Sequence, residues 1–544
     1  MKKLKLSGLI GLAMAAMLAL AGCGSNTGTS GVVDIPEGKS VSQQKDVVAA
    51  VAVDITTMDP MDTSDNLSGG IQRLVMDGLY GFDDDMKLKP MLATGYTANP
   101  EATEFTFTLR KGVKFSDGTD WNADAAIANV NKWMDKSLGL KRTSFVSGII
   151  EKVEKIDDYT IKFTLNKPFG AFVNNMAHPA MVMMSPKQIA AGLDATAKHP
   201  VGTGQYTFVE WVPGDHVTLA LNKNWWGYNK DVAGGEALVA PDAGFKTITF
   251  KPVGENSSRV AMLQSGDAQM IFDVPSESYS ALEQDSNLHV DKAQSISVRY
   301  LMMNTQKPAL SDPRVRQAIA LAIDKNAYVN VVRNGLASVA TSVIGPNVQY
   351  YKANDPIPYD VEKAKALLKE AGYGNGLKLK LLMYNTSANQ KQSEFYKQQL
   401  AAVGIDVEIN GMESAIVNQK AQGFKGEGKD AEYDIYMGSW SPSTGDADWG
   451  MRPILASEST PPRSYNMSFY QNPEMDALLQ AGLTTSDTNA RAAAYAKAQD
   501  LAWKDLPMVP MVNDFTTWAT SNKISGVRMY PDNSINISKA RMAE

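Results

Sequence analysis

The chain has 544 residues, 44% of them hydrophobic and 21% charged, so it is a globular protein long enough for more than one domain. Its 59 acidic residues outnumber its 53 basic residues and give a formal net charge of −6. A net acidic chain lacks the electrostatic footprint of a nucleic-acid-binding protein and of a polybasic membrane-binding surface. We therefore expect no nucleic-acid partner.

Residues 1–22 have the pattern of a secretory signal peptide. Three lysines precede an apolar stretch over residues 9–20, which is too short for a comfortable membrane span. Cys23, the single cysteine of the chain, ends the sequence LAGC, which resembles the lipobox of bacterial lipoproteins. This resemblance implies that Cys23 is lipidated and becomes the mature N-terminus. The alternative is a chance cysteine in a leader that is cleaved elsewhere.

Residues 23–45 are rich in Gly, Ser and Thr without periodicity, which is typical of a flexible tether. With Cys23 modified, no thiol remains for disulfide bonds, zinc binding or nucleophilic catalysis. Lipid chains on Cys23 would anchor the protein outside the cytoplasm on the cell membrane. In an organism with an outer membrane, that is the periplasmic side.

Folded sequence begins at residue 46, and its first half mixes strand and helix patterns. Apolar or alternating runs predict strands over residues 47–53, 105–109, 159–165, 216–221, 245–251, 268–272 and 298–303. Helices are predicted around Ile71 and Leu74, from Asn122 to about residue 134, and over residues 258–264. The break at residues 199–204 marks a predicted lobe boundary.

The second half of the chain alternates strands and helices. Strands are predicted over residues 377–384, 405–410, 433–440 and 508–512, and helices after Asp312 and over residues 361–371, 472–482 and 487–503. This order predicts a parallel α/β sheet. Ligands of open sheets bind beyond the carboxyl ends of the strands, so the loop after residue 440 is predicted to lie at a binding site.

The predicted strand over residues 433–440 is followed by a polar loop with a tryptophan at each end. This loop is the candidate binding surface. Trp440 and Trp449 could form the apolar walls of a pocket, with ordinary core packing as the alternative for either. Ser441, Ser443 and Thr444 can donate or accept hydrogen bonds without fixed charge.

The same loop carries two carboxylates, Asp446 and Asp448. They could act as the acid and base of a hydrolase, meet a ligand ammonium group, or order the loop through Asx turns. No nucleophile or cofactor motif accompanies them, which disfavours catalysis. The four histidines show no metal-binding spacing, so we expect neither a metal nor a cofactor.

Arg299 interrupts an otherwise apolar predicted strand. Because a guanidinium binds a carboxylate through two parallel hydrogen bonds, Arg299 is the candidate for a ligand carboxylate. The alternative is an arginine at a sheet edge or paired with an acid of the protein. Tyr300 alternates to the other face and is predicted to be structural.

Four segments resemble the extracytoplasmic peptide-binding proteins of ABC importers, solute-binding protein family 5. They are MDP at residues 58–60, LRKGVKFSDGTDWNADA at 109–125, HPVGTGQYTFVEW at 199–211 and SDPRVRQAIALAIDK at 311–325. KRTS from Lys141, the Arg299-Tyr300 pair and the loop SWSPSTGDADW look most like the glutathione-binding branch. For the dipeptide-binding branch, the resemblance implies an acid where this chain has Ser443.

The resemblance implies an α/β, periplasmic-binding-protein-like fold: two lobes with mixed sheets, joined by a double hinge, one lobe enlarged by an extra subdomain. The implied parts are lobe 1 over residues 46–83, 200–296 and 515–544, its extra subdomain over 84–199, and lobe 2 over 297–514. The implied function is capture of glutathione or a related short peptide by lobe closure, and delivery to the permease and ATPase subunits of an ABC importer. The alternative ligands are a general di- or oligopeptide or a metal chelate. We expect a monomer, and a secreted hydrolase is the least favoured function.

Overall fold

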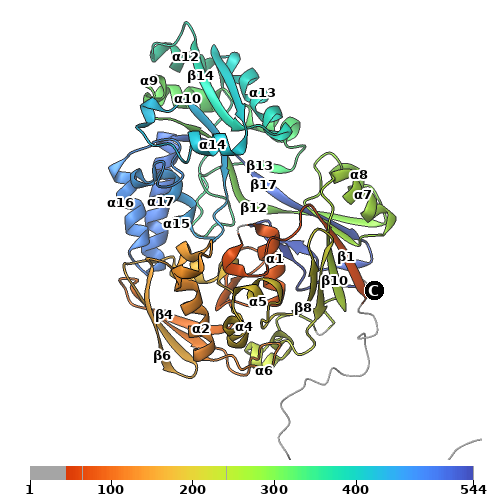
Figure 1. Ribbon diagram of the computed structural model, residues 1–544. Helices are drawn as coiled ribbons and strands as arrows, with labels where there is room; N and C mark the ends of the chain where they lie inside the picture. The colour runs from red at the N-terminus through yellow and green to blue at the C-terminus, as the bar shows by residue number, and fades with distance from the viewer. Residues whose placement is uncertain (1–44, 64, 241, 543–544) are drawn as a thin grey trace, which may run out of the picture. The chain divides into compact units, whose positions relative to one another are not determined.

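The computed structural model describes residues 45–63, 65–240 and 242–542 (Figure 1). All of them belong to one compact unit. The predicted signal peptide, Cys23 and nearly all of the predicted tether lie outside these residues. Among the described helices, none combines the length and the hydrophobicity that a membrane span needs.

An 11-stranded mixed sheet is the framework of the described chain. Its order is β15-β14-β16-β12-β17-β11-β1-β10-β9-β8, and β13 also pairs with β17. The strands are β1 (Asp46–Val51), β8 (Tyr206–Val212), β9 (His216–Leu221), β10 (Thr247–Pro252), β11 (Met270–Phe272), β12 (Leu288–Met303), β13 (Ala337–Val339), β14 (Leu377–Tyr384), β15 (Ile405–Met412), β16 (Ile435–Trp440) and β17 (Met508–Ser521). The predicted α/β class is therefore confirmed.

Two long antiparallel strands, β12 and β17, link the two ends of this sheet (Figure 1). Near its carboxyl end, β17 pairs with β11 through Trp518, Ala519 and Thr520. The carboxyl end of β12, from Val298 to Met303, pairs with β16. The register between β12 and β17 shifts between Gln294 and Val298 and again between Arg299 and Tyr300. The predicted strands over residues 298–303 and 508–512 are shorter than β12 and β17. Polar residues interrupt the apolar pattern where the two strands pass between the two ends of the sheet.

The parallel strand pairing predicted for the second half of the chain is confirmed. Leu377 of β14 lies opposite Ile405 of β15, and Leu381 lies opposite Ile435 of β16. The helices of this half are α9 (Pro308–Ser311), α10 (Pro313–Leu321), α11 (Lys325–Ala327), α12 (Val361–Glu370), α13 (Ser387–Ala401), α14 (Ser414–Lys420), α15 (Ala447–Leu455), α16 (Pro473–Leu483) and α17 (Thr488–Asp505). Apolar residues of α10, α12 and α13 form one core with β12 and β14–β17.

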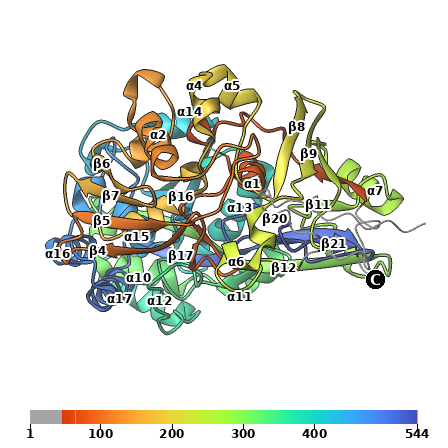
Figure 2. The ribbon, with the colours of Figure 1, turned by 90° about the horizontal axis from the view of Figure 1, so that it is seen from below.

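A separate four-stranded antiparallel sheet lies within residues 93–165 (Figure 2). Its order is β4-β5-β7-β6, with β4 (Ala93–Ala98), β5 (Glu104–Leu109), β6 (Ile150–Asp157) and β7 (Thr160–Leu165). Helix α2 (Ala123–Met134) packs beside β6 and begins at the predicted cap, Asn122, whose side chain accepts the Ala125 N–H. The chain after this sheet contacts the second half of the protein: the Gly170 N–H donates to the Leu483 carbonyl at 2.6 Å.

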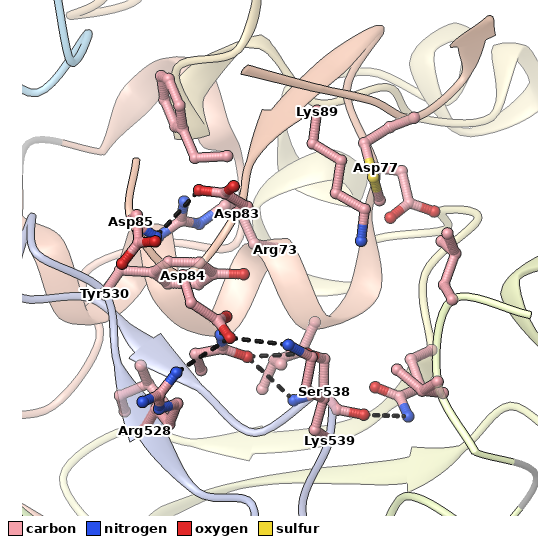
Figure 3. Close-up of a pocket in the computed structure, with 18 of the residues that line it drawn as sticks. Arg73, Asp77, Asp83, Asp84, Asp85, Lys89, Arg528, Tyr530, Ser538 and Lys539 are labelled. Atoms are coloured by element: carbon pink, nitrogen blue, oxygen red, sulfur yellow. Dashed lines mark hydrogen bonds and ion pairs between the residues drawn. The ribbon is translucent and has the colours of Figure 1, made fainter. Parts of the chain in front are cut away.

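The first half also contains short helices and hairpins around β1 and β8–β11. They are α1 (Asn66–Val75), β2 (Tyr80–Phe82), β3 (Leu88–Pro90), α3 (Phe172–Met176), α4 (Pro186–Ala190), α5 (Leu193–Lys198), α6 (Lys230–Ala233), α7 (Asn256–Ser265) and α8 (Tyr279–Glu283). The C-terminal strands β18 (Ile524–Ser525), β19 (Arg528–Met529), β20 (Ile535–Asn536) and β21 (Arg541–Met542) return to this half. Together α1, the β2–β3 hairpin and residues 528–539 surround a cavity (Figure 3).

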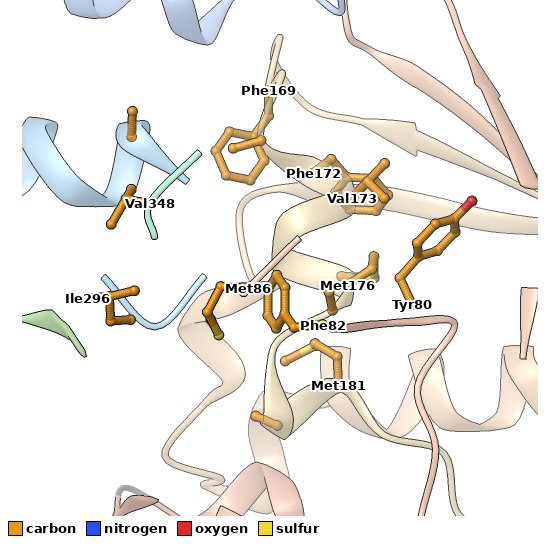
Figure 4. Close-up of a cluster of buried hydrophobic side chains, with 14 of the residues drawn as sticks. Tyr80, Phe82, Met86, Phe169, Phe172, Val173, Met176, Met181, Ile296 and Val348 are labelled. Carbon is orange, nitrogen blue, oxygen red and sulfur yellow. The ribbon is translucent and has the colours of Figure 1, made fainter. Parts of the chain in front are cut away.

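One buried cluster of hydrophobic side chains joins segments that were predicted to belong to different lobes (Figure 4). Phe82 and Met86 of the β2–β3 hairpin lie in it, together with Phe172, with Ile296 of β12 and with Val348 from the second half. The predicted boundaries near residues 84, 199, 297 and 514 stay predictions, since the described chain forms a single compact unit.

Candidate functional site

A crevice opens at the carboxyl ends of β14 and β16. The two strands pair only through Leu381 and Leu382, and beyond this pairing they separate around a cavity of about 290 Å³. The lining includes Arg299, Met302, Tyr384, Asn389, Gln392, Gln422, Tyr436, Ser439, Trp440, Ile454, Tyr465 and Met467. This is the edge of the sheet at which the strand order predicts a ligand.

Arg299 lines this cavity from β12. Its Nε lies 2.7 Å from Oδ2 of Asp514, and Arg333 lies 2.9 Å from Oδ1 of the same carboxylate. Burial disfavours the charged guanidinium, but the Asp514 carboxylate outweighs it and raises the pKa of Arg299. Two guanidinium groups share one carboxylate, which leaves one positive charge in surplus beside the cavity.

Trp440 also lines the cavity, and Trp449 stands behind it. Their rings are 5.6 Å apart, and Tyr465 lies 4.8 Å from the Trp440 ring. The Trp440 indole donates to the Trp449 carbonyl at 2.7 Å, which fixes the orientation of the ring. Phe145 from the first half completes the aromatic group at 6.1 Å from Trp449.

The hydroxyl side of the predicted loop contacts the first half of the chain. Oγ of Ser443 lies 3.1 Å from Nε2 of His178, and the Asn174 amide donates to the Thr444 carbonyl at 3.2 Å. The Thr444 hydroxyl is buried and has no partner among the described residues. Ser441 is partly exposed at the start of the loop.

His178 is held neutral. Burial lowers the pKa of His178 to about 3, helped by the charges of Arg142 and Arg73. Its Nδ1 accepts the backbone N–H of Ala180 at 3.1 Å, so the proton of the neutral ring is on Nε2. The ring therefore donates to Ser443.

Asp446 and Asp448 are buried and already paired. Asp446 caps α15 by accepting the Asp448 N–H, and Arg491 lies 2.8 Å from its Oδ1. Asp448 accepts from Nε of Arg452 at 2.8 Å. Burial raises the pKa of Asp446. Oδ2 of Asp446 has no hydrogen-bond partner among the described residues, but both carboxylates are buried, so a ligand ammonium group does not reach them in this arrangement.

The predicted loop is shorter than expected, because α15 begins at Ala447, directly after its cap Asp446. The lining of the cavity does not include six predicted ligand-binding residues: Ser441, Ser443, Thr444, Asp446, Asp448 and Trp449. The alternating pattern placed Tyr300 correctly in the core, where it is buried.

Sequence reasoning missed Tyr384, Asn389, Gln392, Gln422 and Tyr465 as cavity residues. The available signal was the polar run NTSANQKQ directly after a predicted strand, which forms the beginning of α13. Within the described chain, no group of three or more His, Cys, Asp or Glu side chains could hold a metal ion.

The sequence and the fold match known proteins over nearly the whole described chain. The family model "Bacterial extracellular solute-binding proteins, family 5 Middle" matches residues 87–461. The glutathione-binding protein GsiB of Salmonella choleraesuis is 39% identical over 499 residues, which is 91% of this chain and 94% of that protein.

Two solved structures show the same fold. HbpA2 from Haemophilus parasuis superposes with a TM-score of 0.81 at 23% identity, over 92% of this chain and 100% of that chain. DppA from Helicobacter pylori, a periplasmic binding protein in complex with the peptide STSA, superposes with a TM-score of 0.70 at 28% identity. The match covers 92% of this chain and 99% of that chain. The predicted two-lobed fold is therefore confirmed, and the chain belongs to the bacterial extracellular solute-binding proteins, family 5.

Proposed function

We propose that this chain is the substrate-binding protein of an ABC importer and captures glutathione or a related short peptide. The observation that carries this proposal is the 39% identity to a glutathione-binding protein over 91% of the chain. The crevice beyond β14 and β16 supports it, because it offers positive charge, aromatic walls and polar amides. We expect binding without turnover.

In this proposal, Arg299 holds a ligand carboxylate with the positive charge that Asp514 leaves uncompensated. The first turns of α13, through Asn389 and Gln392, add amide groups at a helix N-terminus, where negative charge is favoured. Trp440 and Tyr465 flank the ligand.

The loop of Ser441, Ser443, Thr444 and Trp449 then forms the wall where the two lobes meet. Closure takes place about β12 and β17, and its free energy comes from ligand contacts that exist only in the closed state. The His178–Ser443 hydrogen bond already joins this loop to the first half of the chain. The permease and the ATPase subunits would recognise the closed form.

We further propose that Cys23 is lipidated and holds the protein on the extracytoplasmic face of the cell membrane. The support is the signal-peptide pattern that ends in LAGC. Metabolic labelling with an alkyne fatty acid tests this proposal. Label in the parent protein and none in a Cys23→Ala variant would support it.

Mass spectrometry of the ligand that co-purifies with the unheated protein, followed by calorimetric titration, tests the function. Reduced glutathione, oxidised glutathione and di- to pentapeptides are titrated separately. Saturable binding of either glutathione form supports the proposal. Binding of ordinary peptides alone would overturn the choice of ligand, and hydrolysis of any peptide would overturn the class.

A general peptide-binding protein is the second candidate. The observation in its favour is the similarity to DppA from Helicobacter pylori in complex with STSA. The same titration separates the two candidates, because a glutathione-specific crevice leaves STSA unbound.

A further inference from the structure

A second cavity, of about 350 Å³, lies in the first half of the chain (Figure 3). Its walls are the end of α1, the β2–β3 hairpin, Gln205, Trp225, residues 238–239 and the C-terminal residues 528–539. None of its lining residues lines the crevice at β14 and β16. The volume is near the lower end of the range for small-molecule sites, so it fits a small ligand.

Several charged side chains around this cavity pair with one another. At the rim, Asp84 lies 3.1 Å from Arg528 and 2.7 Å from Lys539. Arg73 lies 3.3 Å from Asp532 and stacks on a tyrosine ring. These pairs hold the C-terminal segment against α1 and the hairpin.

Two further acids lie on the turn of the hairpin and face water. Asp83 accepts the backbone N–H groups of Asp85 and Lys87 at 2.9 and 2.8 Å, so it orders the turn. Asp83 is partly exposed and Asp85 is exposed, and solvent screens both charges.

One acid and one base remain inside. Asp77 is 6% exposed, and its Oδ2 accepts from the Trp226 indole at 2.8 Å and from the Thr203 hydroxyl at 2.9 Å. The nearby Trp225 indole also lowers the pKa of this carboxyl group, although burial outweighs it. Lys89 extends its ammonium group into the cavity from the hairpin (Figure 3), and no described acid lies within ion-pair distance of it.

The residues that line the cavity carry three buried polar atoms without partners in the described chain, and Nε of Arg73 is one of them. The Gln205 Oε1 and the Trp225 Nε1 make no hydrogen bond within the described residues, although these side chains are only 4% and 5% exposed. A buried polar group left unpaired costs about 1–3 kcal/mol, so the cavity offers one acceptor and one donor to an occupant. Water could satisfy these two atoms, but it could not neutralise Lys89 and Asp77.

We propose that this cavity binds a small zwitterion, a free α-amino acid, whose carboxylate meets Lys89 and whose ammonium group meets Asp77. The Trp225 indole and the Gln205 amide oxygen add one hydrogen bond each. Burial raises the pKa of Asp77 and lowers the pKa of Lys89, so each ionised group gains stability from a ligand group of opposite charge.

Thermal-shift screening of the full mature chain with each proteinogenic amino acid, followed by calorimetry, tests the proposal. We expect one site per chain. The amide of the best ligand lacks the carboxylate and its N-acetyl form lacks the ammonium group, so each should bind more than about tenfold more weakly. This series uses the unaltered protein and does not depend on how a variant folds.

Lys89→Met and Asp77→Asn should each weaken amino-acid binding by more than about tenfold. Lys87→Met, an exposed lysine on the same hairpin, is the matched control and should change nothing. Arg299→Ala should leave amino-acid binding intact, which separates this site from the crevice. The proposal is overturned if no free amino acid binds, if binding persists in both cavity variants, or if soaked crystals show only ordered water there.

Discussion

Arg299 lies at the crevice with its charge only partly compensated, because Asp514 is shared with Arg333. Replacement of Arg299 by alanine leaves the Arg333–Asp514 pair in place, so the fold should survive. We expect ligand affinity to fall by about 2–5 kcal/mol, the usual cost of removing one partner of a desolvated charge pair. Calorimetric titration with the proposed ligand measures the effect.

Arg314→Ala is the matched control, because Arg314 pairs with Asp312 on the exposed surface of α10. This variant should bind as the parent does. Equal affinity of Arg299→Ala and the parent protein would remove Arg299 from the ligand site.

His178 should make the protein less stable in acid. The unfolded chain takes up a proton near pH 6.5, whereas the folded ring stays neutral down to about pH 3 because it is buried. The contribution of neutral His178 to the free energy of unfolding is therefore complete above pH 6.5. It is reduced by about 2 kcal/mol at pH 5 and falls further toward pH 3.

Urea unfolding of the parent protein and of His178→Asn at pH 7 and pH 5 measures this contribution. Asparagine keeps an acceptor for the Ala180 N–H and does not titrate. The stability difference between the two proteins should shrink at pH 5, and an unchanged difference would contradict the prediction.

Lys325 is a buried ammonium group without a hydrogen-bond partner among the described residues. Burial lowers its pKa to about 8, and its contact with the Trp503 ring, at 5.7 Å, offsets only about 0.5–1 kcal/mol. Lys325→Met should raise the free energy of unfolding at pH 7 by about 1–3 kcal/mol.

The gain from Lys325→Met should be full below pH 8 and vanish as the pH approaches 10.5, where the unfolded lysine also loses its proton. Lys363→Met, on the exposed face of α12, is the control without a gain. A gain that does not change with pH would show that packing, and not charge, is the cause.

At the scale of elements, the connection from β16 to α15 depends on a glycine. Gly445 has φ +64°, and a Cβ there would lie 3.3 Å from the Phe82 ring. Gly445→Ala should cost about 1–2 kcal/mol of unfolding free energy because of the left-handed backbone. Urea unfolding measures this loss of unfolding free energy. Gly95→Ala in β4 is the control, because the added Cβ meets nothing within 4 Å there. Equal stability of the two variants would contradict this reasoning.

The regular elements were predictable where one periodicity runs without interruption. The strands at residues 216–221 and 377–384 have the predicted limits, and α2 begins at its predicted cap, Asn122. The strands β12 and β17 were predicted over only part of their length. The surroundings of each strand change midway, so no single pattern of buried residues runs through it.

The sequence indicates the edge of the sheet at which the candidate site lies, but not most of the residues that line it. Of the predicted ligand-binding residues, Arg299 and Trp440 line the crevice, and their contact with a ligand stays a prediction. Burial of Asp446 was not predictable, because its partner Arg491 approaches only after α15 and α17 have packed. The Arg452–Asp448 pair is different, because Arg452 follows Asp448 by four residues on the same helix. The role of Tyr465 depends in the same way on its tertiary contact with Trp440.

For the whole molecule, segments from both predicted lobes contact one another in the described chain. The hydrophobic cluster of Phe82, Met86, Ile296 and Val348 is buried between segments from both predicted lobes (Figure 4). If the lobes separate without ligand, this cluster becomes hydrated. Its burial then contributes to closure, and closure contributes to ligand affinity.

Val348→Asp should therefore weaken ligand binding without a change in any ligand contact. An acid in this cluster costs at least about 1.4 kcal/mol when it is buried, so affinity should fall about tenfold or more. The open state hydrates the acid, so unfolding of the ligand-free protein should change little. Calorimetry measures the affinity, and small-angle scattering with saturating ligand reports closure. Val209→Asp, at an exposed position of β8, is the control. Parent-like affinity of Val348→Asp would show that the cluster is buried in the open form as well, and that closure takes place elsewhere.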